Sequence, residues 1–221
     1  MLRTYFQCFV YDARQSYLRQ TRRRRSRSFV QGFLKLQYPI LGNRVASLSA
    51  TSVDGFSVEI NETVLNNFFH ALLSIAPGRG GIGMGGENGT TTASANADLW
   101  SSSINNGIVV GTGTTAVAPT DFQLATQITD GTSSGTLEHF PSSGTNFSTS
   151  GSTASFDLER LFRNSSSGSI TITEVGVYSG WSQSASDDMN HFCILRDLVS
   201  PGFTVANGEY LRIVYTVSVT A

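Results

Sequence analysis

The chain has 221 residues, enough for one large domain, and its 39% of apolar residues is below the share of most globular proteins. Two cysteines, Cys8 and Cys193, are too few for a disulfide framework, and we expect free buried thiols. No apolar run approaches the roughly 20 residues of a membrane-spanning helix, so the composition argues against a helical membrane protein.

The net charge of −1 conceals a strong asymmetry along the chain. Residues 1–44 contain ten Arg or Lys and a single acid, Asp12, which gives a net charge of +9. Residues 45–221 contain five Arg or Lys and fifteen acids, which gives −10. Because opposite potentials steer protein encounters, we expect residues 1–44 to form a basic arm that docks on the acidic body of a neighbouring copy, making a homo-oligomer.

The sequence of the basic arm favours a helical or partly extended conformation. Between Asp12 and Tyr38 the only glycine or proline is Gly32, and Arg, Gln and Leu are good helix formers. Four apolar residues recur at helical spacing, namely Phe29, Val30, Phe33 and Leu34. An arm with little to bury should become ordered on assembly, so deletion of residues 1–28 is expected to leave a folded domain that no longer assembles.

The arm contains the one concentrated charge feature of the chain. Its members are Arg22, Arg23, Arg24, Arg25 and Arg27. Such a run can neutralise phosphates and bind nucleic acid without sequence preference. It can also dock on an acidic protein surface, which residues 45–221 supply, and we favour docking. Together with Phe29 and Phe33, these arginines are the candidate contacts for assembly or for nucleic acid.

Residues 45–106 form a mixed segment. Ser47–Ile60 predicts one or two short strands with a turn at Asp54–Gly55. Thr63–Ala76 has apolar residues at helical spacing and predicts a short helix. Residues 77–106 are rich in Gly, Ser and Thr and predict a long loop.

Residues 107–221 predict an all-β domain. Six segments have the composition and alternation of strands: 107–110, 122–128, 153–162, 169–178, 191–198 and 209–220. A change of phase within residues 169–178 predicts a β-bulge near Thr173–Glu174. Because turn signals and no helices separate the strands, the segment predicts an antiparallel β-sandwich or jelly roll.

No motif predicts a cofactor, a metal site or an active site. Gly111–Ala116 matches the G-x-G-x-x-A dinucleotide pattern, but Val117–Pro119 cannot begin the helix that binds the pyrophosphate. The three histidines lie at no metal-ligand spacing, and no nucleophile elbow is present. We interpret Glu174, at the predicted bulge, as a partly buried structural carboxylate that needs hydrogen bonds. We therefore expect a protein without enzymatic activity.

Three segments are similar to β-rich structural proteins of the heads and tails of tailed bacteriophages. They are Ile108–Thr115 with Pro119–Leu124, then Ile172–Tyr178, and then Arg196–Asp197 with Asn207–Glu209 and the terminal strand. The resemblance covers residues 107–221 and does not include the basic arm. It implies a virion structural protein (head decoration, collar, or tail or fibre component) that is made in the host cytoplasm, contacts other virion proteins and has no catalytic residues.

Two alternative functions remain open. A capsid protein could contact packaged nucleic acid through the arginine run, which predicts steeply salt-dependent binding. A receptor- or carbohydrate-binding fibre module could instead use Trp181 and Tyr178, because aromatic rings can stack on a sugar.

Overall fold

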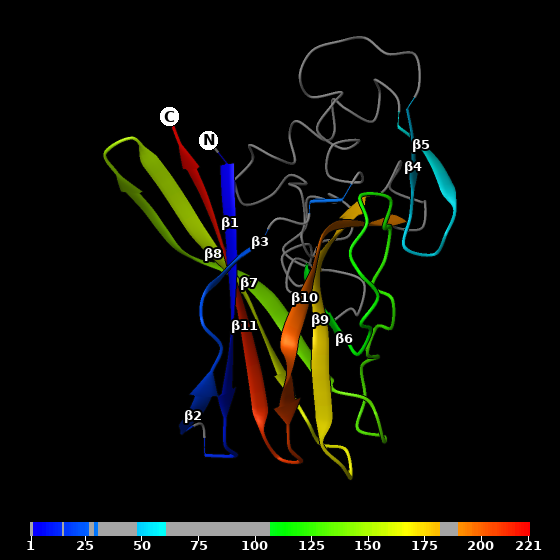
Figure 1. Cartoon of the computed structure of the whole chain (residues 1–221), viewed down its shortest axis with the longest axis vertical. Coiled ribbons are helices and arrows are strands. Elements are labelled where there is room, and N and C mark those ends of the chain that lie inside the picture. The colour runs from blue at the N-terminus through cyan, green and yellow to red at the C-terminus, as the bar shows by residue number, and fades with distance from the viewer. Residues whose placement is uncertain (1, 15, 27–28, 31–47, 61–106, 182–189) are drawn as a thin grey trace, which may run out of the picture.

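The computed structural model describes residues 2–14, 16–26, 29–30, 48–60, 107–181 and 190–221 (Figure 1). All regular elements within these ranges are β-strands, and every pairing between them is antiparallel. The prediction of a mainly β protein with antiparallel sheets is therefore confirmed. The predicted helix at 63–76, the predicted loop at 77–106, Arg27 and Phe33 lie outside the described residues.

The larger sheet has six strands in the order β2-β1-β11-β8-β7, with β3 also paired to β1 (Figure 1). Its strands are β1 (Leu2–Tyr11), β2 (Tyr17–Gln20), β3 (Arg24–Ser26), β7 (Glu138–Ser150), β8 (Thr153–Arg163) and β11 (Tyr210–Thr220). Strands β1 and β11 pair along their whole length, so the two ends of the chain lie side by side.

The smaller sheet has three strands in the order β10-β9-β6. Its strands are β6 (Gly107–Gly111), β9 (Ile170–Trp181) and β10 (Asn190–Val205). A separate hairpin consists of β4 (Leu48–Thr51) and β5 (Ser57–Ile60), as predicted. Gly55 in its turn has a φ of 84°, a left-handed conformation that glycine adopts without strain.

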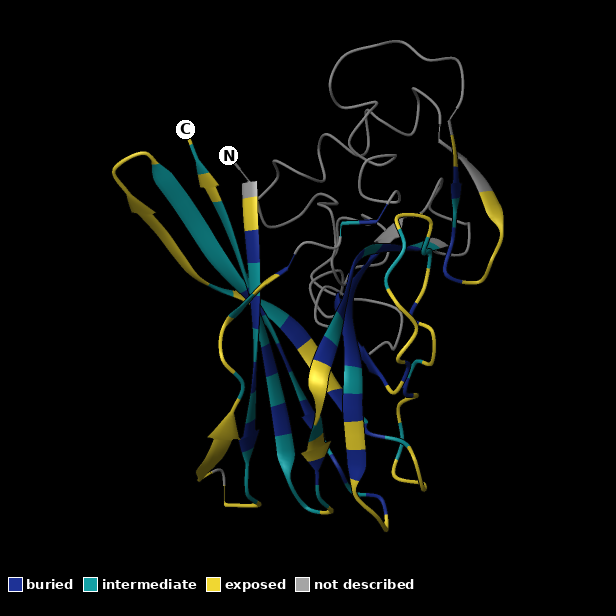
Figure 2. Cartoon of the chain, in the orientation of Figure 1, coloured by how far each residue is buried: buried dark blue, intermediate teal, exposed yellow. Residues whose placement is uncertain are grey.

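One hydrophobic cluster contains side chains from both sheets. In Figure 2, buried stretches, in dark blue, occur along strands of both sheets. The six-stranded sheet contributes Phe6, Cys8, Val10, Leu158, Phe162, Leu211, Ile213 and Tyr215. The three-stranded sheet contributes Ile108, Val110, Ile170, Ile172, Val175, Val177, Leu195, Val199 and Val205. Each buried apolar side chain stabilises the fold by about 1.5–3 kcal/mol relative to an exposed one, so the two sheets depend on each other for stability.

Strand β1 overturns the expectation that the N-terminal segment is an arm separate from the β-domain. Its residues alternate, with Thr4, Phe6, Cys8 and Val10 buried and Tyr5, Gln7 and Phe9 only partly exposed. It lies inside the six-stranded sheet, between β2 and β11. The alternation of β1 is visible in the sequence. Its partner strand β11, however, lies at the opposite end of the chain, and no local pattern indicates that the two strands pair.

Of the two conformations expected for the arm, helical or extended, the structure shows the extended one in the residues that it describes. Residues 17–20 and 24–26 are extended and pair with β1, although their composition suits a helix. Phe29 forms a bridge with Leu195 and packs against the hydrophobic cluster. Helix propensity is overridden here because extended residues satisfy the main-chain groups along the edge of β1.

The basic segment and the acidic body meet within one chain. Arg19 forms an ion pair of 2.9 Å with Glu209, and its guanidinium lies 5.7 Å from the centre of the Phe203 ring. The sequence predicts docking on a neighbouring copy, whereas this contact is intramolecular.

The strand predictions for the C-terminal half are confirmed for β6, β8, β9, β10 and β11. The predicted strand 122–128 is wrong, because this segment is an irregular loop with a single bridge from Gln127 to Gly111. Strand β7 is not predicted by the sequence, since its Ser, Thr, Gly and Asn residues give no apolar alternation.

The irregularity predicted near Thr173–Glu174 is present, but the extra residues are in the partner strand. Ile172 of β9 pairs with Phe203 of β10, and Glu174 of β9 pairs with Leu198 of β10. The stretch of β10 between these two pairs therefore contains more residues than the stretch of β9 opposite it. Ile172 and Val175, three residues apart in β9, both contribute to the hydrophobic cluster.

Candidate functional site

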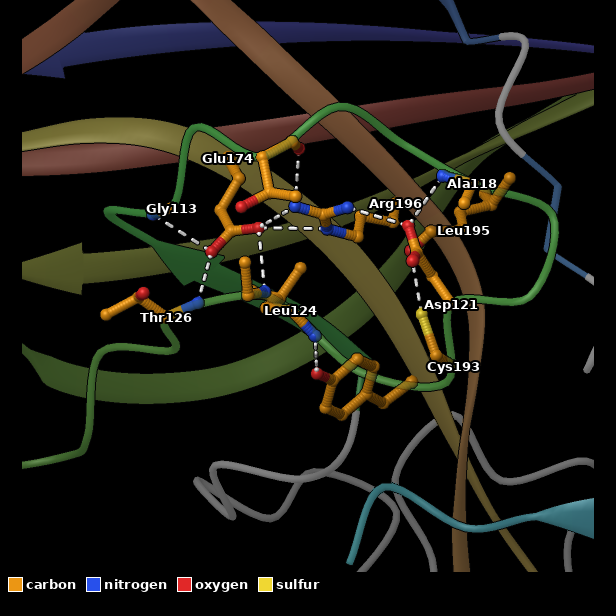
Figure 3. Close-up of polar contacts among 12 residues, drawn as sticks. Gly113, Ala118, Asp121, Leu124, Thr126, Glu174, Cys193, Leu195 and Arg196 are labelled. Carbon is orange, nitrogen blue, oxygen red and sulfur yellow. Dashed lines mark hydrogen bonds and ion pairs between the residues drawn. The ribbon is translucent and has the colours of Figure 1, made fainter. Parts of the chain in front are cut away.

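A network of buried polar groups attaches the loop after β6 to strands β9 and β10 (Figure 3). The loop, residues 112–128, has no regular secondary structure. Its main-chain groups are instead bonded to side chains of β9 and β10, which hold it in one conformation.

Glu174 of β9 is the acceptor at the centre of this network, and it is 0% exposed. Its Oε1 accepts hydrogen bonds from the main-chain N–H of Gly113 (3.0 Å) and Thr126 (2.7 Å). Its Oε2 accepts one from the N–H of Ala125 (3.1 Å). The carboxylate therefore replaces the strand partners that this irregular loop lacks.

Arg196 of β10 supplies the positive charge, and its side chain is 2% exposed. Its Nε donates to Glu174 Oε2 (3.0 Å) and its Nη1 to Asp121 Oδ2 (2.6 Å). A third bond runs from Nη2 to the carbonyl of Thr115 (2.9 Å). Burial alone lowers the pKa of Arg196, but hydrogen bonds to Asp121 and Glu174 outweigh burial and raise the pKa above its ordinary value.

The glycines of the Gly111–Ala116 motif are explained by this carboxylate and not by a nucleotide. A Cβ atom on Gly113 would lie 2.3 Å from Glu174 Oε1 and 2.7 Å from the Cβ of Ala125. A Cβ atom on Gly111 would lie 2.4 Å from the carbonyl oxygen of Thr126. Both positions therefore need a residue without a side chain so that the loop can approach Glu174.

Replacing Gly113 by alanine is expected to destabilise the fold by about 1–3 kcal/mol, because the methyl group has no space beside Glu174. Gly168→Ala, in the turn between β8 and β9, is the matched control, since nothing lies within 4 Å of its Cβ position. Urea denaturation followed by circular dichroism measures both. Equal midpoints for the two variants would contradict the proposed packing of Gly113 on the carboxylate.

Tyr178 belongs to the same network and is fully buried, at 0% exposed. Its Oη accepts a hydrogen bond of 2.6 Å from the N–H of Leu124, and burial raises the pKa of its phenol. The ring is not available to a sugar, so the predicted carbohydrate contact at Tyr178 is wrong. The other predicted contact is Trp181, whose side chain the structure does not describe.

The network has the chemistry of a structural clamp. Both oxygens of Glu174 accept main-chain hydrogen bonds, and Arg196 donates to two carboxylates and a carbonyl. Cys193 lies close by, but burial raises the pKa of its thiol and its Sγ donates to the carbonyl of Leu195. The sequence prediction that Glu174 is structural and hydrogen-bonded agrees with this geometry.

Two further buried polar residues are His139 of β7 and Arg160 of β8. Arg160 donates from Nε to the carbonyl of Phe140 (2.7 Å) and from Nη1 to that of Ile108 (2.9 Å). His139 packs edge-on against Phe162, with 4.9 Å between ring centres, and neither ring nitrogen has a hydrogen-bond partner among the described residues. Burial and the charge of Arg160 lower the pKa of His139 to about 4.

Because the pKa of His139 is lowered by folding, we expect the protein to lose stability in mild acid. The unfolded histidine binds a proton near pH 6.5 and the folded one only near pH 4. The folded state is therefore fully favoured above pH 6.5 and loses up to roughly 3 kcal/mol as the pH falls to about 4. His139→Phe keeps a ring against Phe162 and should flatten this part of the stability profile, as measured by urea denaturation between pH 4 and 7. An unchanged slope would contradict the assignment.

The arginine run occupies a different place from the clamp. Arg22, Arg23 and Arg25 are exposed and Arg24 is partly exposed, at or next to β3 on the six-stranded sheet. The guanidinium of Arg23 lies 4.5 Å from the centre of the Tyr5 ring. The clamp, in contrast, is formed on the three-stranded sheet. Among the candidate contacts, Phe29 is largely covered by its own chain, as described above.

No family model, curated protein or solved structure matches this chain. In the parts of the chain that the structure describes, no group of His, Cys, Asp and Glu side chains is arranged to hold a metal ion. The same parts contain no helix with the length and apolar character required to cross a membrane.

Proposed function

We propose that the chain is a structural protein of a bacteriophage particle that assembles with copies of itself and with neighbouring virion proteins. One observation supports this proposal above the others. The segments that resemble phage virion proteins, which include Gly113, Asp121, Glu174 and Arg196, are far apart in the sequence but meet in the buried clamp. These four residues therefore serve to maintain the fold, as we expect of a structural component of a particle.

The proposal includes a β-sandwich as the architecture of this protein. Its support is the hydrophobic cluster, described above by its residues, to which both sheets contribute. Because the basic segment from β1 to β3 is part of the six-stranded sheet, we assign assembly contacts to other exposed surfaces and not to a free arm.

The location on a virion is tested with an antibody raised against the purified chain. Particles from a lysate of the strain that encodes it are treated with nuclease and separated on a density gradient. The chain is expected to co-sediment with intact particles at a fixed ratio to the major capsid protein. Recovery only among the soluble proteins at the top of the gradient would overturn the proposal.

A second candidate function is contact with packaged nucleic acid. Its support is the exposure of Arg22, Arg23 and Arg25, for which no ion pair is found among the described residues. Gel shifts with duplex DNA at two salt concentrations test it. Replacing all three arginines by serine should reduce the slope of log binding constant against log salt concentration by about 2–3. Arg14→Ser, a control at another exposed arginine, should change this slope by at most about 1.

A further inference from the structure

Other parts of the chain form main-chain hydrogen bonds with both edges of the three-stranded sheet. Along β6, the N–H of Ile128 donates to the carbonyl of Val110 (2.9 Å). Along β10, the N–H groups of Val30 and Val53 donate to the carbonyls of Ile194 and His191 (3.2 and 2.8 Å). These contacts satisfy edge groups that could otherwise pair with another protein.

One edge of the six-stranded sheet is protected in a different way. Strands β2 and β3 are only 4 and 3 residues long, and both contain arginine. Short and charged edge strands resist pairing with other chains, because little hydrogen bonding is gained and like charges repel.

The opposite edge, β7, lacks both kinds of protection. The strand is 13 residues long. For residues 143–150 the main chain has no partner other than β8 within the described ranges. The stretch from 139 to 156 contains no Asp, Glu, Lys or Arg. Phe147 near its outer end is 72% exposed, so an apolar side chain lies beside unpaired main-chain groups.

We propose that β7 is a self-association edge, at which residues 143–150 pair antiparallel with the same residues of a second copy. An uncharged strand suits its own copy as a partner, because two-fold pairing brings no like charges together. The inference rests on the self-assembly part of the proposed function and not on the virion location.

A bulge limits how the two strands meet. Register with β8 shifts between Thr145 and Ser148, and Asn146 has a φ of 53°. Pairing with a second copy therefore uses the regular stretches on either side, while Phe147 projects for side-chain contact. Because the other edge of the sheet is short and basic, pairing through β7 closes a dimer and does not continue into a filament.

The mass of the full-length chain in solution, measured by light scattering, tests the dimer. Wild type is expected at twice the mass of one chain. Thr149→Lys places a charge in β7 and should weaken the dimer at least about tenfold. Thr132→Lys is the matched control at an exposed loop position and should leave the mass unchanged. A wild-type monomer at about 100 μM, or an undisturbed Thr149→Lys dimer, would overturn the inference.

Single cysteines introduced at positions 143–150 test the geometry. The native Cys8 and Cys193 are buried, and burial raises the pKa of both thiols, which keeps them unreactive. Antiparallel pairing about a two-fold axis predicts one position of most efficient disulfide formation, with yields falling on both sides. Uniformly low yields would overturn it. A wild-type chain that is monomeric in solution yet co-sediments with particles would overturn the dimer and leave the virion proposal intact, so the two failures are distinguishable.

Discussion

Replacing Arg196 by methionine is expected to destabilise the protein by about 3–5 kcal/mol, because Glu174 and Asp121 lose their shared counter-charge. Glu174 would remain fully buried with three main-chain donors but no cation, and Asp121 would face it across the clamp. Urea denaturation at pH 7 measures the change. The loop 112–128 should also exchange its amide hydrogens faster, since its attachment to β10 is lost.

The matched control for Arg196 is Arg212→Met. Arg212 also contacts a carboxylate, Glu159, but both side chains are partly exposed, at 37% and 23%. A partly exposed pair contributes about 0–1 kcal/mol, so the control should change stability little. The double variant Glu174→Gln with Arg196→Met removes both buried charges and should be more stable than Arg196→Met alone. Equal effects of Arg196→Met and Arg212→Met would show that the clamp does not stabilise the fold.

Deletion of residues 1–28 is expected to abolish cooperative folding, the opposite of what the sequence predicts. The deletion removes β1, β2 and β3, and β11 loses its partner β1 together with the buried side chains of Phe6, Cys8 and Val10. Each of these contributes on the order of 1.5–3 kcal/mol, and their sum is comparable to the whole stability of a domain. The expected result is loss of the thermal transition in circular dichroism and recovery in the insoluble fraction.

A full-length chain with Arg22, Arg23 and Arg25 changed to serine is the control for this deletion. It removes the exposed charges and keeps β1, so it should retain a cooperative transition within about 1 kcal/mol of wild type. If the deleted chain unfolded cooperatively like the full-length one, β1 would be dispensable and the N-terminal segment would be an appendage after all.

The two predictions divide the basic segment into parts with different roles. β1 is part of the six-stranded sheet, whereas Arg22, Arg23 and Arg25 after it are exposed. The intramolecular pair between Arg19 and Glu209 links the two charged halves of one chain, so the charge asymmetry of the sequence does not by itself require a second copy.

The clamp shows which site features can be read from a sequence and which cannot. The phase change in residues 169–178 correctly indicated an irregularity beside Glu174 and a carboxylate in need of hydrogen bonds. The same sequence did not indicate that Gly113, Asp121 and Arg196 would be its neighbours. These residues come together only when β9 and β10 pair and the loop folds over them, so the contacts depend on tertiary packing.

The amino-acid sequence alone determined the strand-forming character of β6, β8, β9, β10 and β11 and the turn between β4 and β5, because period and turn chemistry act over a few residues. Only the tertiary structure decided that β1 pairs with β11, that β7 is an edge strand, and that residues 17–26 are extended. Those outcomes depend on main-chain partners distant in the sequence, whose hydrogen bonds and buried area outweigh local preference.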